Sequence, residues 1–149
     1  LIECTFLRDQ EQLNVAKTLE LCDVAVSSFA LEGALSPFLT LMEKLAGRFE
    51  RAGKVSECLA IHARIHCYLL KYEETTHRKD PVFAYLRVLL GADKFAEAKA
   101  LLEEEVQFFE GNGREGKTRL TTHILDYFFI CLLLGDEQAM ESSLYLRWV

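Results

Sequence analysis

The sequence contains little proline and glycine, with two prolines and eight glycines among 149 residues. All-β sandwiches and barrels need many turns, so this scarcity argues against them and favours long helices. No apolar run reaches the roughly 18 residues that a membrane-spanning helix needs. The longest run, from Tyr127 to Leu134, has eight residues. We therefore expect no transmembrane segment.

Basic residues are also in the minority, with 17 Lys and Arg against 23 Asp and Glu, a net charge of −6. A protein of this charge is a poor ligand for a phosphate backbone, so we expect no nucleic-acid partner. The five cysteines form no C-x-x-C pair, which predicts reduced, buried thiols in the cytosol or nucleus. The sequence opens without a secretory signal. We expect residues 1–149 to be one domain and a piece of a longer chain.

The spacing of apolar residues predicts an all-α protein of about seven helices. Ser36-Pro37 is expected to begin the second helix as N-cap and first residue, followed by an apolar stripe that includes Leu41. The helix that ends at Leu134 is apolar on most sides, so we expect it to be deeply buried. The expected helices cover residues 9–31, 37–52, 55–72, 81–90, 95–109, 116–134 and 137–149.

Three breaks between helices resemble one another and recur about every 40 residues. They contain Gly or Asp and are followed by a small or sulfur-containing residue, namely Cys58, Ala98, and Ala139 or Met140. A period of this size is typical of stacked helical hairpins, because one hairpin cannot bury its own apolar face. The pattern predicts a right-handed superhelix of antiparallel hairpins. The breaks are Ala52–Val55, Gly91–Phe95 and Leu134–Glu137.

At these residues the chain resembles tetratricopeptide-like repeats and, more narrowly, the soluble NSF attachment protein (SNAP) family. The counterparts of the family's late units are Tyr85–Leu90, Lys94-Phe95-Ala96-Glu97-Ala98 and Leu101–Phe109, and then the pair from Lys117 to Ala139. The branch of the huntingtin-associated 40-kDa protein fits the pattern about as well. Such motifs encode packing and identify an architecture better than a function.

The resemblance implies a non-enzymatic, cytoplasmic adaptor without a cofactor, attached to membranes only through its partners. For a SNAP, the partners would be a SNARE-type helical bundle and a hexameric ATPase. For the huntingtin-associated branch, the chain would be a subunit held inside a large helical-repeat protein. A SNAP-like superhelix has one basic face that holds acidic partner helices.

Three segments are candidates for partner binding. Residues 48–79 are locally basic, and the apolar end of the chain would expose a surface that needs a cap or a partner. Glu103-Glu104-Glu105 is expected to be a solvated helix face, with an acidic docking patch as the alternative. The candidate partner-binding residues are Arg48, Arg51, Lys54, Arg64, Lys71, Tyr145 and Trp148.

The segment 111–118, GNGREGKT, matches the P-loop pattern G-x-x-x-x-G-K-[ST]. In a P-loop, the backbone at Gly116 would cradle phosphates, Lys117 would contact the β- and γ-phosphates, and Thr118 would bind Mg²⁺. A P-loop follows a buried strand, whereas residues 103–110 fit the end of an amphipathic helix. We favour an interhelical loop and keep a nucleotide-binding module as the alternative function.

Cys58, His62 and His66 are spaced four residues apart and would share one helix face. His-x-x-x-His with a nearby Cys is a known zinc-ligand arrangement, but the sequence places no fourth ligand. A Cys/His nucleophile pair is a weaker alternative, because nothing supplies an orienting group or an oxyanion hole. The apolar surroundings favour packed core side chains and no metal.

Overall fold

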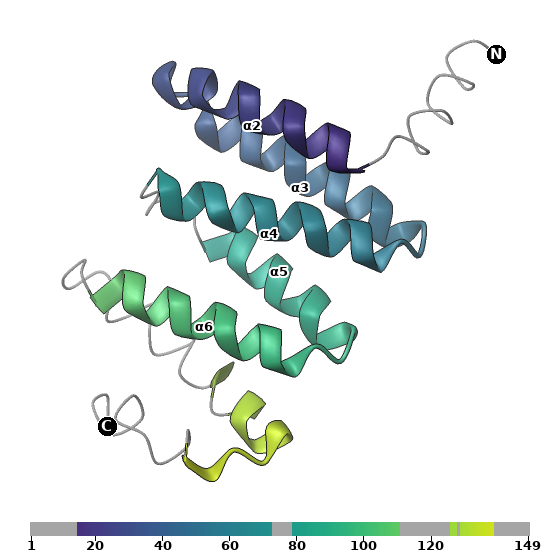
Figure 1. The fold of residues 1–149 in the computed structure, drawn as a ribbon, viewed down its shortest axis with the longest axis vertical. Coiled ribbons are helices and arrows are strands. Elements are labelled where there is room, and N and C mark those ends of the chain that lie inside the picture. Colours follow the sequence, from purple (N-terminus) through teal and green to yellow (C-terminus); the bar gives the residue numbers. More distant parts are fainter. Residues whose placement is uncertain (1–14, 73–78, 111–125, 128, 139–149) are drawn as a thin grey trace. The chain divides into compact units, whose positions relative to one another are not determined.

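Helices form nearly all of the chain that a computed structural model describes, namely residues 15–72, 79–110, 126–127 and 129–138 (Figure 1). These ranges contain no β-strand, so the predicted all-α class is confirmed for them. The superhelical arrangement of the hairpins stays a prediction. The helices with defined bounds are α2 (Val15–Leu31), α3 (Leu35–Arg51), α4 (Val55–Lys71), α5 (Lys79–Gly91) and α6 (Phe95–Glu110).

Four tight turns share one backbone conformation. Each contains a residue in the left-handed region, at φ 71° for Gly33, 75° for Gly53, 57° for Asp93 and 67° for Gly135. In each turn the next residue donates its N–H to the carbonyl five positions earlier, which is the Schellman cap. These bonds run from Ala34 to Phe29 (2.8 Å), Lys54 to Phe49 (2.9 Å), Lys94 to Leu89 (2.9 Å) and Asp136 to Cys131 (3.0 Å).

The last three of these turns recur with the predicted period. Gly53, Asp93 and Gly135 are separated by 40 and then 42 residues, as their numbers show. The fifth residue after each of the first two turns is fully buried, Cys58 in α4 and Ala98 in α6. The corresponding positions of the third unit, Ala139 and Met140, lie outside the described residues. The predicted breaks are therefore confirmed as turns.

The start of α3 differs from the prediction. The helix begins at Leu35 with Ala34 as its N-cap, and no side chain caps it. Ser36 is thus the second helical residue and Pro37 the third. A proline is tolerated there, because the first-turn N–H groups have no partner within the helix. Leu35 is buried, so packing extends the helix beyond its capping signal.

The first compact unit, Leu1–Tyr85, has its described core between α2, α3 and α4. α3 packs most extensively on α4, and α2 contacts both. The side of α3 that faces this core carries Phe38, Leu39, Met42 and Ala46. Leu41 is 65% exposed, so its assignment to the apolar stripe was wrong. Phe38, Leu39, Met42 and Ala46 occupy the buried face of α3, and Leu41 lies outside it.

The second unit, Leu86–Val149, buries only one side of its last described helical segment. Tyr127, Ile130 and Cys131 are buried, whereas Phe129 and the run from Leu132 to Leu134 are exposed. The expectation that this helix is buried all round was therefore wrong for its last turn. In the described ranges, no helix has both the length and the apolar character to cross a membrane.

Polar contacts join α6 to that segment. Lys99 Nζ lies 2.8 Å from an Asp136 oxygen and 3.7 Å from a Glu103 oxygen. The Tyr127 hydroxyl donates a hydrogen bond to Glu103 at 2.9 Å. Glu105 is fully buried, so the prediction of a solvated acidic run was wrong at that residue. Only Glu104 of the run is exposed.

The cysteines of the described part are free thiols. Cys58 and Cys131 are buried and Cys22 is half-buried, but Cys67 is exposed, so the prediction of buried thiols was wrong for Cys67. Burial raises the pKa of both Cys22 and Cys131. A raised pKa keeps a thiol protonated, whereas nucleophilic cysteines need a lowered one.

Two glycine variants test the role of the left-handed turn. Gly53→Ala places a Cβ at φ 75° and should lower the free energy of unfolding by about 1 kcal/mol. Gly47→Ala, in the interior of α3, should raise it by about 1 kcal/mol because alanine favours the helix. Urea denaturation followed by circular dichroism measures both. Equal effects of the two substitutions would contradict this account of the turn.

Candidate protein-docking surface

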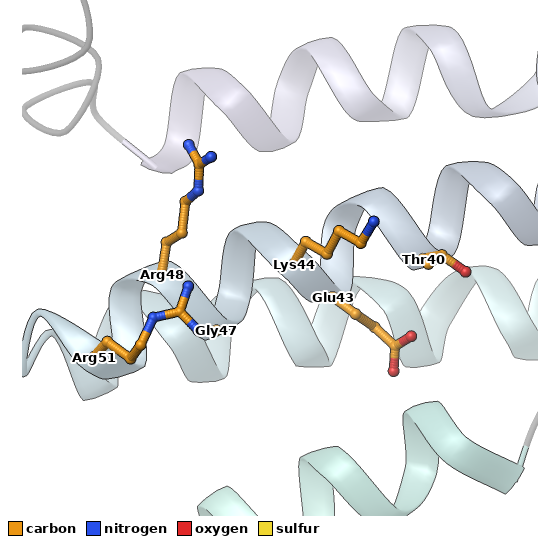
Figure 2. A pocket seen from close by; sticks show the side chains of 6 residues that line it. All are labelled: Thr40, Glu43, Lys44, Gly47, Arg48 and Arg51. Atoms are coloured by element: carbon orange, nitrogen blue, oxygen red, sulfur yellow. The ribbon is translucent and has the colours of Figure 1, made fainter. Parts of the chain in front are cut away.

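A pocket of about 490 Å³ lies along the outer side of α3 (Figure 2). We call it the α3 pocket. All of its lining residues come from one helix, at spacings of three and four, and three of them are basic. The lining residues are Thr40, Glu43, Lys44, Gly47, Arg48 and Arg51.

The basic side chains are available to a partner. Within the described residues, Lys44, Arg48 and Arg51 make no ion pair with the protein's own carboxylates. Arg48 and Arg51 lie in the last turn of α3, where cations stabilise the negative end of the helix dipole. The same side chains are therefore favourable for the helix and attractive to an acidic ligand.

Gly47 lies in the pocket between Lys44 and Arg48. A Cβ at this position would meet only Arg51 Nη1, at 3.9 Å. No neighbouring helix therefore requires a glycine here, although glycine costs a helix interior about 1 kcal/mol relative to alanine. The missing side chain leaves the backbone of α3 accessible beside the guanidinium groups.

Arg64, one of the candidate partner-binding residues, contacts another helix of the protein itself. It forms an ion pair with Asp23, and the Tyr68 hydroxyl donates a hydrogen bond to the same carboxylate. The hydrogen bonds from Arg64 and Tyr68 lower the pKa of Asp23. Burial and the bond to Asp23 raise the pKa of Tyr68. This cluster links α2 to α4, so Arg64 holds two helices together.

The other candidate cations lie near aromatic rings. Lys54 Nζ is 6.0 Å from the centroid of Phe49, and Lys71 Nζ is 5.5 Å from that of Tyr72. Tyr145 and Trp148 lie outside the described residues. Of the three basic residues that line the α3 pocket, the sequence analysis named Arg48 and Arg51 as candidate partner-binding residues and missed Lys44. The four-residue spacing of Lys44 and Arg48 in a predicted helix would have placed both on one face.

Cys58, His62 and His66 do share one face of α4, as predicted, and all three are buried. The ring of His62 stacks on Tyr85 with centroids 5.8 Å apart, and His66 lies 6.3 Å from the same ring. Among the described side chains, no group of three potential ligands is placed to hold a metal ion. The two histidine rings of α4 therefore pack against Tyr85 of α5.

The P-loop residues Gly116, Lys117 and Thr118 lie outside the described part of the chain. The segment directly before Gly111 is helical, because α6 extends to Glu110. A P-loop follows a strand.

Comparison with protein-family models, curated proteins and solved structures finds no match to this chain. The resemblance to SNAP-like repeats therefore stays an interpretation of the sequence pattern.

The Asp23 cluster gives a pH-dependent prediction. The pKa of Asp23 is lower in the folded protein than in the unfolded chain, where it is 3.8. The ionised carboxylate therefore makes its full contribution to the free energy of unfolding above pH 3.8. This contribution is lost as the pH falls through the pKa of the folded protein. Asp23→Asn should lower the free energy of unfolding by about 1 kcal/mol at pH 7. The difference from the unsubstituted chain should shrink in acid.

Urea denaturation at pH 7 and pH 3 measures this difference. The control is Glu20→Gln, which removes an exposed carboxylate from the same helix. A destabilisation of Asp23→Asn that is the same at both pH values would contradict a role for the ionised carboxylate.

Proposed function

We propose that the chain is a non-catalytic adaptor whose α3 pocket binds an acidic helical segment of a partner protein. The observation that supports this most is the row of Lys44, Arg48 and Arg51, which is basic on a chain of net charge −6. Charge of the opposite sign steers association and selects the partner. The proposal includes a cytoplasmic location and the SNAP-like type of adaptor that the sequence resembles.

The shape of the surface suits a helix better than a small ligand. The pocket is shallow, since one helix supplies its whole lining. Small-molecule sites are concave and mostly apolar, whereas this lining is polar and charged. Carboxylates spaced three or four residues apart on a partner helix would match cations that have the same spacing.

A second candidate is an obligate subunit of a larger complex. The exposed run from Leu132 to Leu134, with Phe129, supports it, because contiguous apolar surface marks protein-binding sites. Such a subunit would bury this surface against a large helical-repeat protein.

Charge reversal in the pocket tests the adaptor proposal. The double variant Arg48→Glu/Arg51→Glu should weaken binding of a fluorescent acidic helical peptide by about 30-fold, because attraction becomes repulsion. Fluorescence anisotropy measures the affinity, which should also fall with added salt. A scrambled peptide of the same charge tests whether the helical spacing matters.

The matched control is Arg87→Glu/Lys94→Glu, which makes the same change in net charge at exposed residues that do not line the pocket. It should leave the affinity within about threefold of the unsubstituted chain. Equal losses in both double variants would show that overall charge, and not the α3 pocket, determines binding.

A further inference from the structure

The outer side of α2 carries apolar residues where an exposed helix is normally polar. Leu21, Val24 and Leu31 are 64%, 76% and 89% exposed. The buried residues of α2, Leu19 and Val26, lie on the opposite side. α2 therefore has two apolar faces, and only one of them packs within the described part of the chain.

The exposed apolar residues form a regular row. Together with Lys17 and Ser28 they are separated by four, three, four and three residues, which is the spacing of a coiled-coil seam. At 100° per residue the row occupies an arc of ~80°. We call it the α2 seam. Its members are Lys17, Leu21, Val24, Ser28 and Leu31.

The α2 seam is complementary to itself when two copies run antiparallel. With Val24 opposite its own counterpart, Leu21 faces Ser28 and Lys17 faces the end of the helix near Leu31 and Glu32. A large residue thus meets a small one, and a cation meets a carboxylate. A twofold axis beside Val24 would relate the two helices. The symmetry would form the pair of Lys17 with Glu32 twice.

The charges at the ends of the seam are available for this pairing. Lys17 and Glu32 are exposed, and neither makes an ion pair within the described residues. Asp23, which is also on α2, is directed to Arg64 on the other side of the helix. Glu20, a further exposed carboxylate of α2, lies beside the α2 seam, whereas Lys17 and Glu32 are the charges that an antiparallel second copy would bring together.

We propose that the α2 seam is a homodimer interface in which α2 packs antiparallel on α2 of a second copy. The interface is small, so the dimer is weak, with a Kd of roughly 10–100 µM. No member of the α2 seam lines the α3 pocket, and the proposed dimer does not depend on the proposed adaptor function. Two copies would present two α3 pockets, which raises avidity for a partner with repeated acidic helices.

Sedimentation velocity over a concentration series tests the interface. The unsubstituted chain should change from monomer to dimer as its concentration rises. Val24→Glu places two carboxylates on the axis and should weaken the dimer about 100-fold or more. Leu41→Glu, at an exposed leucine of α3 outside the seam, is the matched control and should dimerise normally. Circular dichroism of each variant establishes that it is folded.

A charge exchange tests the antiparallel geometry. Lys17→Glu and Glu32→Lys should each weaken the dimer about tenfold, and the double variant should restore it. Restoration is expected only if the two residues face each other across the interface. A monomer at all concentrations, equal loss with Leu41→Glu, or no restoration in the double variant would overturn the proposal. The first outcome would mean that another segment or partner covers the seam.

Discussion

The left-handed turn is the constraint on which the rest of the structure depends. A Schellman cap ends one helix and the next begins after three residues, so the chain changes direction within a short turn, after which α3 packs on α2 and α4 packs on α3. Gly53 and Asp93 adopt this conformation 40 residues apart. Glycine does so without a steric cost, and aspartate is among the few other residues that tolerate it. Helices paired in this way bury one face each and leave the other available.

The two exposed faces of the first unit have different chemistry. α3 faces outward with Lys44, Arg48 and Arg51, whereas α2 faces outward with Leu21, Val24 and Leu31. Asp23 of α2 forms an ion pair with Arg64 and accepts a hydrogen bond from Tyr68, and these contacts fix α2 to α4. A basic surface suits recognition of acidic partners, and an apolar seam suits association of like helices. One hairpin scaffold can therefore support two separate interactions.

In the described part of the chain, the sequence predicted the helices and turns well, because apolar periodicity and glycine positions are local signals. The ends of α4 and α6 fall within one residue of the prediction. The sequence did not predict which apolar residues stay exposed, as Leu41 and Leu132 show, because exposure depends on how many faces find a neighbour. It also could not show that Arg64 is paired with Asp23, which is 41 residues away. That Arg48 and Arg51 share one helix face was predictable, because they are three residues apart in a predicted helix.

Backbone amide exchange, resolved by NMR, tests the hairpin architecture most directly. The amides of Ala34, Lys54, Lys94 and Asp136 lie at the tight turns yet donate to a carbonyl five residues earlier. They should exchange as slowly as amides in the adjoining helical turns, because opening them requires opening the hairpin. Fast exchange at these four positions, with slow exchange in the helices, would contradict the claim that the caps hold the helices together.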